Sequence, residues 1–375
     1  SVSQLGLDSI LVNEIVTNPE KKGKIIGTAI WMRLPASVIS FICILIMVAI
    51  IEPGNNLLWI ITALQAFAVV CRGYELLNCW FLSELNSKYY VIANIAGQTA
   101  VSVWKLVLIA GGASVLWFGA STTIQALVCG VIISSIFLKL KDFKMGFSLE
   151  IARKLLSKSI HYVLAGIAVA LYTQMDKVMV GKMLGETEVG YYTAAMTIAM
   201  LWEFVPQAII NSSSAVILEK KTTSEEEYQK RLKLLFFLIS VMGLMVGIAV
   251  QIFGKLAVYI LYGRQYLEAV PVLKLLVWST SFAMIGVARN IWSLAENKNR
   301  FSKNYTICGS VVNLVLNYLT IPVWGIQGAA ASTLVAEIVV ALVSPLVWKE
   351  TRSFVAFYFH SWREGIVWMK ENWRG

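Results

Sequence analysis

The sequence predicts an all-α polytopic membrane protein, and three observations support this. Of its 375 residues, 58% are hydrophobic and only 14% are charged, a balance too apolar for a soluble domain of this size. The apolar residues gather in runs of about 20 or more, the length that crosses about 30 Å of hydrocarbon as a helix. These runs lack the two-residue alternation of barrel strands, so helices are the spanning structure that they favour.

Ten runs of spanning length organise the chain. They lie at 31–51, 57–82, 90–112, 116–138, 160–184, 189–218, 234–253, 270–295, 305–323 and 326–348. We expect residues 1–29 to form an interfacial amphipathic segment and a cytoplasmic loop, and 30–138 to hold four spans of a first helical lobe. A basic stretch, 139–159, is expected to be a cytoplasmic linker before a second lobe of six spans at 160–348. The tail, 349–375, has apolar residues at helical spacing and is expected to lie at the membrane interface.

The distribution of basic residues predicts the orientation. If the first segment is cytoplasmic and the spans alternate, the inner segments hold 24 of the 32 lysines and arginines, Arg33 among them. The outer loops hold only Lys255 and Arg264. Because cytoplasmic segments are enriched in Lys and Arg, we expect a multi-pass membrane protein with both ends of this chain cytoplasmic. The net charge of +10 thus reflects topology, and no nucleic-acid partner is expected.

Several kinds of chemistry lack the residues that they need. All five cysteines fall within apolar runs, where a thiol behaves as a small hydrophobe. With only two histidines, His161 and His360, a histidine-rich metal site is excluded. The sequence contains no G-x-x-x-x-G-K-[ST] motif, so it has no P-loop ATPase of its own. We expect no cofactor, no resident metal and no catalytic residues.

The stretch 174–199 carries charge into the spans. Asp176 and Lys177 lie in an apolar run that ends near Gly185, and a short polar turn leads into the next run. An ionised side chain at the bilayer centre costs roughly 2.5 to 3.5 kcal/mol on insertion scales. The pair is therefore expected to face protein or water, as a structural ion pair or as a protonatable switch.

Other runs carry polar residues on one helical face. The third run has Asn94, Gln98, Ser102 and Lys105; the second has Gln65, Arg72 and Glu75; the sixth has Glu203, Gln207, Asn211 and Ser214; the ninth has Thr306, Ser310, Asn313 and Asn317; the eighth and tenth have Arg289 and Glu337. These groups either join helices by hydrogen bonds or line a shared wet cavity. The sequence favours a cavity with more cations than anions, suited to an anionic polar substrate with a sugar or phosphate headgroup.

Four stretches together resemble a known family. They are LGLDSILVNEI, MDKVMVGKMLGETEVGYYTAA, LYGRQYLEAVPVLKLLVW and NLVLNYLTIPVWGIQGAAASTLVAE. In order and spacing they are similar to the O-antigen and polysaccharide repeat-unit flippases of the multidrug/oligosaccharidyl-lipid/polysaccharide exporter superfamily. The resemblance implies twelve helices in two six-helix lobes, with the first two helices upstream of Ser1. It also implies transport of undecaprenyl-pyrophosphate-linked sugars to the outer leaflet by alternating access.

The resemblance and the polar faces together give the candidate residues. The expected substrate cavity comprises Arg72, Lys105, Lys177, Arg289, Asn94, Gln98, Gln207, Asn211, Asn313 and Asn317, and the expected coupling residues are Asp176, Glu203 and Glu337. The expected partners are a lipid-linked oligosaccharide, membrane lipid and other polysaccharide assembly proteins. Two alternatives remain: a cation-coupled drug exporter of the same superfamily, which predicts an acidic pocket, and a membrane polysaccharide polymerase.

Overall fold

The computed structural model describes residues 8–51, 53–84 and 86–372, and their side chains except at 8–10, 13, 51, 158, 160–172, 215, 368 and 370–372. Within these ranges all regular structure is helical. The chain divides into two compact units, Ser1–Leu171 and Tyr172–Gly375. The stretch 139–159, predicted to be a linker, belongs to the first unit.

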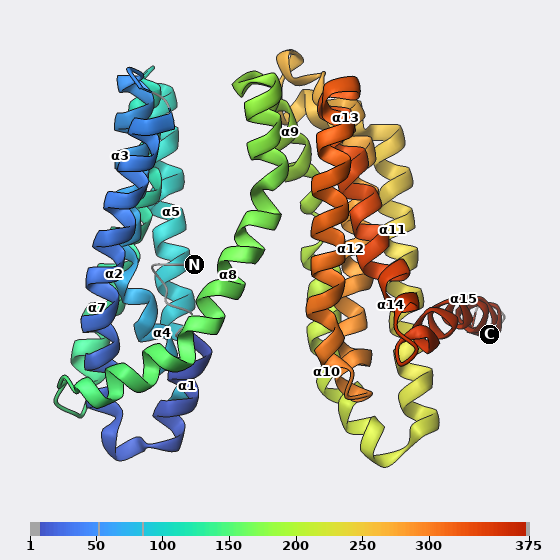
Figure 1. Ribbon diagram of the computed structural model, residues 1–375, viewed down its shortest axis with the longest axis horizontal. Helices are drawn as coiled ribbons and strands as arrows, with labels where there is room; N and C mark the ends of the chain where they lie inside the picture. Colours follow the sequence, from blue (N-terminus) through green and yellow to red (C-terminus); the bar gives the residue numbers. More distant parts are fainter. Residues whose placement is uncertain (1–7, 52, 85, 373–375) are drawn as a thin grey trace. The chain divides into compact units, whose positions relative to one another are not determined.

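The first unit consists of helices that follow one another along the chain (Figure 1). They are α1 (Asp8–Thr17), a 3₁₀ turn (Pro19–Lys21), α2 (Lys22–Ile51), α3 (Asn56–Cys71), a 3₁₀ turn (Arg72–Tyr74), α4 (Glu75–Ser83), α5 (Lys88–Ala110), α6 (Val115–Gly119), α7 (Ser121–Leu140) and the first part of α8 (Leu149–Leu184). The span α2 begins nine residues before the predicted run, at Lys22 rather than Trp31. The predicted second span is divided into α3 and α4 by the 3₁₀ turn at Arg72.

The start of α8 packs with α1 in the core of the first unit. Leu11 and Ile15 of α1 and Leu155 of α8 are all buried in one cluster with Trp80 and Phe137. Lys154 Nζ lies 2.8 Å from Glu14 Oε2 across the same contact. Part of the apolar side of each helix is therefore covered by protein.

Before α8, an irregular segment crosses back over the start of α2. Ser148 donates its backbone N–H to Thr28 Oγ1 at 3.0 Å, and Lys22 Nζ lies 3.0 Å from Asp142 Oδ1. The hydrogen bond from Lys22 holds the pKa of the Asp142 carboxyl below its usual value. These contacts fix the segment between α7 and α8.

The second unit contains the end of α8 and the remaining helices. They are α9 (Glu186–Met200), α10 (Phe204–Thr223), α11 (Glu225–Tyr262), a 3₁₀ turn (Arg264–Tyr266), α12 (Ala269–Ala295), a 3₁₀ turn (Asn299–Phe301), α13 (Ser302–Ile338), a π-helical turn, η5 (Val339–Val343), α14 (Ser344–Val347) and α15 (Arg352–Asn372). Helices α9 and α10 are bent by 44° at their junction. Pro206 follows in the first turn of α10, where the missing N–H costs no helical hydrogen bond.

Helix α13 folds back on itself at Gly325, which has a positive φ of 57°. Thr320 Oγ1 lies 2.9 Å from Ser332 Oγ across the two arms. A Cβ on Gly328 would lie 2.5 Å from the carbonyl oxygen of Thr320, so this close approach requires glycine. The two arms correspond to the predicted ninth and tenth spans.

The fold class is confirmed. Seven helical segments of the described chain are long and apolar enough to span a membrane, and the bent pair α9–α10 makes an eighth. One of the seven, 299–347, contains the α13 hairpin and thus two predicted runs. The predicted run 160–184, with His161, lies partly outside the described side chains.

Glycines allow close packing of α11 on α12. A Cβ on Gly243 would lie 2.9 Å from the Ser281 side chain, and a Cβ on Gly247 would lie 2.5 Å from the Trp278 ring. At both positions the absence of a side chain permits the close approach of the two helices.

Candidate functional site

The second unit encloses a polar cavity of about 330 Å³ between α8, α9, α12 and both arms of α13. Three of its acidic residues, Asp176, Glu203 and Glu337, were predicted to act in coupling. Lys177 and Asn313, predicted to bind substrate, also line it. The remaining lining residues are Thr173, Gln174, Tyr192, Met196, Met200, Ser279, Thr280, Ala283, Met284 and Thr333.

Asp176 is the centre of a hydrogen-bond network that joins three helices. Tyr192 of α9 donates its hydroxyl to Oδ2 at 2.8 Å, and Thr333 Oγ1 of α13 lies 2.7 Å from the same oxygen. Asn317, on the other arm of α13, donates Nδ2–H to Oδ1 at 2.6 Å. Hydrogen-bonded partners of this kind replace the water that a carboxylate loses on leaving solvent.

The two asparagines of α13 leave an oxygen atom without a partner. Asn317 is fully buried and also donates Nδ2–H to Asn313 Oδ1 at 3.1 Å. Its own Oδ1 is buried and accepts no hydrogen bond from the described residues. An unsatisfied buried acceptor costs about 1 to 3 kcal/mol. Carboxylate, amide and hydroxyl oxygens thus gather in one place, and these are the ligands that hard cations prefer.

This cavity holds more acidic than basic groups. Three carboxyl groups face one ammonium group, that of Lys177. The sequence had indicated more cations than anions, because Arg72, Lys105 and Arg289 were counted toward the same cavity. None of these three lines the cavity of the second unit.

Arg289 lies inside α12 and is 3% exposed. Its guanidinium Nη1 donates to the carbonyl oxygens of Val340 and Ala341, the latter at 3.2 Å. The guanidinium also lies over the Tyr305 ring, 4.3 Å from its centroid. Both carbonyls belong to η5, where π-helical geometry disturbs the regular hydrogen bonding. Arg289 therefore joins α12 to the π-helical turn η5.

The predicted cations of the first unit lie on exposed surface. Arg72 is 44% exposed, and its Nε lies 3.9 Å from Glu75 Oε1. Glu75 Oε2 accepts a hydrogen bond of 2.6 Å from Arg33, a residue 2% exposed within α2. Arg33 was counted with the cytoplasmic segments, but it is a buried residue of the span. Lys105 is exposed on α5.

The remaining predicted residues contact their own helix or a neighbouring helix of the same unit. Asn94 donates to the Tyr90 carbonyl at 3.0 Å, and Gln98 accepts from Gln125 of α7 at 3.0 Å. Gln207 donates to Asn211 on the same helix at 3.1 Å, and neither residue lines the cavity.

Sequence reasoning missed two residues that contact Asp176, namely Tyr192 and Thr333. The sequence shows Tyr192 near the start of an apolar run, where its hydroxyl is a polar group. Thr333 stands among small residues, and no local pattern separates it from other threonines. Only the fold of the α13 hairpin brings it to the carboxylate.

A family model described as "Polysaccharide biosynthesis protein" matches residues 1–218. The chain belongs to this family. The match covers the first unit and continues into α10. No curated protein matches the chain.

Solved structures with the same fold include multidrug resistance MATE family transporters of the MOP superfamily. An inward-facing MATE family multidrug resistance transporter is 16% identical, with a TM-score of 0.76 over 96% of this chain and 88% of the other. An outward-facing structure of such a transporter has a TM-score of 0.63, 16% identity, and coverage of 96% and 84%. A MOP superfamily transporter from Pyrococcus furiosus, described as having a binding pocket of reverse polarity, has a TM-score of 0.63, 15% identity, and coverage of 95% and 84%. At these identities the likeness shows the fold.

Replacing Arg289 should separate a structural role from a substrate-binding role. We expect Arg289→Ala to lower the melting temperature of the purified protein in detergent, because two buried carbonyls lose their donor, at about 1 to 3 kcal/mol for each unsatisfied group. Lys105→Ala, at an exposed position, should change stability by less than about 0.5 kcal/mol. An Arg289→Ala protein as stable as the Lys105→Ala protein would contradict the role in η5.

Proposed function

We propose that this member of the polysaccharide biosynthesis protein family is a flippase of the bacterial inner membrane. It moves undecaprenyl-pyrophosphate-linked oligosaccharide repeat units to the outer leaflet by alternating access, for O-antigen or capsule and exopolysaccharide assembly. The observation that carries this proposal is the family match over 1–218, on a fold shared with MOP superfamily transporters. The excess of basic residues in alternate loops supports cytoplasmic placement of both chain ends.

The exposed cations of the first unit support recognition of the pyrophosphate. Lys105 has no acidic partner among the side chains that the structure describes, and it lies on α5 in line with Asn94, Gln98 and Ser102. Such a polar row is costly against lipid, so it faces protein, water or cargo in the membrane. The lysine ammonium is a charge on a flexible side chain, and the guanidinium of Arg72 can bind a phosphate with two hydrogen bonds. The amides suit sugar hydroxyls.

The oxygen cluster around Asp176 supports coupling to a monovalent cation, Na⁺ or H⁺. A cation beside Asp176 neutralises one of the three carboxyl groups in the cavity. It also takes the buried Asn317 Oδ1, the acceptor without a partner among the described residues, as a ligand. Because Asp176, Tyr192 and Thr333 come from three helical segments, an occupied site holds those segments together. Release of the cation removes that constraint and permits them to separate.

A second candidate function, a cation-coupled exporter of drugs, is favoured by one observation. The cavity of the second unit is acidic and contains Met196, Met200 and Met284, and methionines adapt to varied apolar shapes. A lipophilic organic cation would suit such a lining. The family match favours the sugar lipid as the cargo.

Transport in vesicles distinguishes the two functions. We expect the full-length protein in proteoliposomes to translocate a labelled lipid-linked repeat unit faster than protein-free vesicles do. Arg72→Ala and Lys105→Ala should slow translocation because the pyrophosphate loses a cation. Lys303→Ala removes a charge from an exposed position of the second unit and serves as the control. A rate no higher than lipid background, with efflux of a cationic dye instead, would replace the flippase by the drug exporter.

A cation-dependence experiment tests the coupling site. We expect Na⁺ or protons, supplied as an imposed gradient, to accelerate transport, and one of them to raise the melting temperature of the purified protein, because a ligand that binds only the folded state stabilises it. Asp176→Asn should remove both responses, whereas Glu186→Gln, an exposed carboxyl at the start of α9, should keep them. Equal responses in the two variants would exclude Asp176 as the coupling residue.

A further inference from the structure

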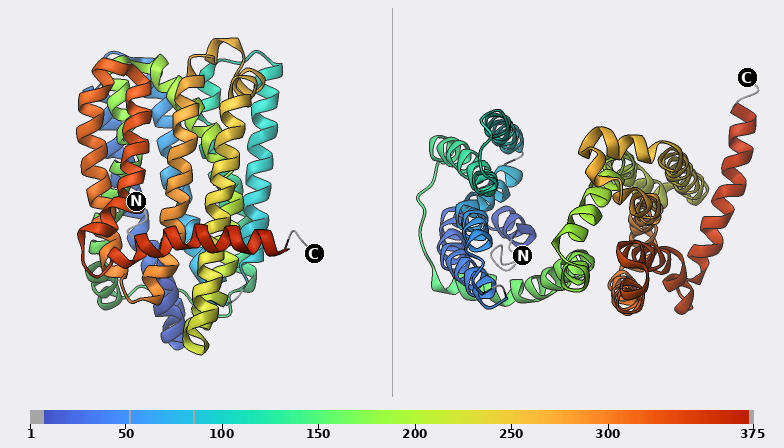
Figure 2. Two further views of the ribbon diagram at one scale, coloured as in Figure 1. Left: turned by 90° about the vertical axis from the view of Figure 1, so that its right-hand side faces the viewer. Right: turned by 90° about the horizontal axis from the view of Figure 1, so that it is seen from above.

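Helix α15 crosses α11 close to the point where α11 leaves the hydrocarbon. Helix α11 has 38 residues, which extend about 57 Å, far more than the ~30 Å of a bilayer core. Its first residues, Glu225 to Lys233, are mostly charged, and its apolar run begins at Leu234. Figure 2 shows α15 lying across the direction of the spans of its unit. This is the arrangement of a helix in the membrane plane.

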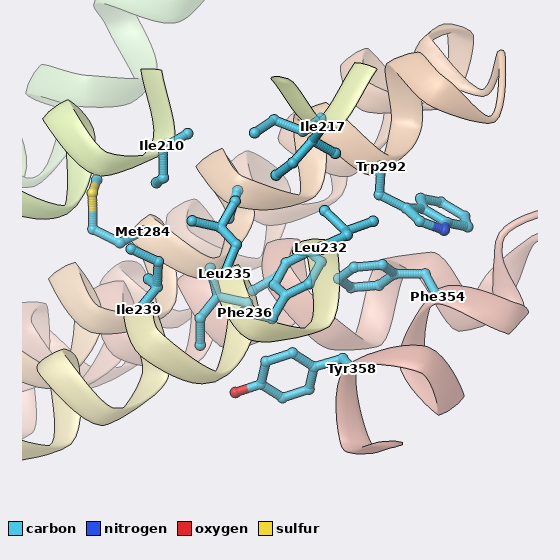
Figure 3. Packing of buried hydrophobic residues seen from close by; sticks show 14 of the residues in the cluster. Ile210, Ile217, Leu232, Leu235, Phe236, Ile239, Met284, Trp292, Phe354 and Tyr358 are labelled. Carbon is cyan, nitrogen blue, oxygen red and sulfur yellow. The ribbon is translucent and has the colours of Figure 1, made fainter. Parts of the chain in front are cut away.

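Aromatic side chains hold α15 firmly in this position. Phe354 and Tyr358 are buried against Phe236 of α11, with ring centroids 5.4 and 6.0 Å away (Figure 3). Tyr358 Oη also lies 3.0 Å from Ser240 Oγ. Farther along, the Gly365 backbone packs directly on the Phe237 ring, which a Cβ would approach to 2.1 Å. The helix is therefore part of the packed unit.

Next to this packed face, α15 presents an apolar face that no described residue covers. Phe359 is 60% exposed, and Ile366 and Met369 are each 42% exposed. They are separated by seven and three residues, so they share one side of the helix. An exposed apolar face beside a polar one is typical of contact with the acyl region of a bilayer.

A groove of about 500 Å³ lies between the charged start of α11 and α15. Its lining residues are Glu226, Gln229, Lys230, Lys233, Leu234, Arg363, Glu364, Gly365 and Val367. Lys233 and Glu364 neutralise each other at 2.6 Å. Lys230 and Arg363 have no acidic partner within the described ranges, and Glu226 is the acidic group that remains. The unpaired charges thus sum to one positive charge.

We propose that this groove binds the headgroup of an anionic glycerophospholipid, phosphatidylglycerol. Its single negative charge complements the groove, and Lys230 and Arg363 bind the phosphate. The glycerol hydroxyls donate to Glu226 and to the amide oxygen of Gln229. Leu234 and Val367 lie beside the headgroup and lead its acyl chains toward the exposed face of α15. The bound lipid joins α15 to α11 at the membrane surface, whatever cargo the protein carries.

The test measures binding of a short-chain phosphatidylglycerol to the purified full-length protein by thermal shift and native mass spectrometry. Lys230→Ala with Arg363→Ala should weaken binding about thirtyfold, since each basic residue near an anionic lipid surface contributes about fivefold. The matched double variant, Lys303→Ala with Lys349→Ala, removes two exposed charges of the same unit outside the groove. It should bind like the unchanged protein.

Further variants and ligands distinguish specific binding of phosphatidylglycerol from misfolding and from binding of other phosphates. Lys230→Arg with Arg363→Lys keeps both charges and should restore binding, which excludes misfolding as the cause of the loss. Phosphatidylcholine and inorganic phosphate should bind more weakly than phosphatidylglycerol. Equal losses in the two alanine double variants, or tighter binding of phosphatidylethanolamine, phosphatidylcholine or free phosphate, would overturn the proposal.

Discussion

A carboxylate among membrane-spanning helices is stable only where polar groups replace the water that it has lost. The second unit satisfies this constraint at Asp176 with donors from α9 and from both arms of α13. The need to bring these donors together explains much of the local architecture. It requires α13 to fold back at Gly325, and it requires the arms to approach as closely as Gly328 allows. The cavity follows from this arrangement.

The two arginines buried in the spans illustrate the same constraint in a different form. Arg33 pairs with Glu75 through Nη2, and Arg289 donates Nη1 to carbonyls of η5 and lies over the Tyr305 ring. Among the described residues, Arg33 Nε and Nη1 and Arg289 Nε are buried without a hydrogen-bond partner. Neither guanidinium is free to follow a moving substrate. Arg72 and Lys105 differ, because they are exposed and have at most a weak ionic partner in the part of the chain that the structure describes. All four side chains are cationic, so charge alone does not distinguish their roles. The exposed cations are available to cargo, whereas the buried ones hold helices together.

The sequence predicted the fold class because membrane spans are encoded locally, by the length and hydropathy of each run. The charged pair Asp176 and Lys177 was likewise visible in the sequence, since charge inside an apolar run is rare. The sequence did not predict which polar residues meet. Asn317 and Thr333 are 16 residues apart and reach Asp176 only because a hairpin joins their helices, and Arg289 faces η5 because of a helical irregularity that no hydropathy pattern records. Helical periodicity gives the face of a residue on its own helix, and tertiary packing decides what that face contacts.

Asp176 and Asn317 stabilise each other by a hydrogen bond across α8 and α13. A double-mutant cycle on the free energy of unfolding in detergent, with Asp176→Ala, Asn317→Ala and the double variant, measures this most directly. We expect a coupling energy of about 1 to 3 kcal/mol, in the range for contacting residues of one network. Additive effects, with coupling below about 0.5 kcal/mol, would contradict it.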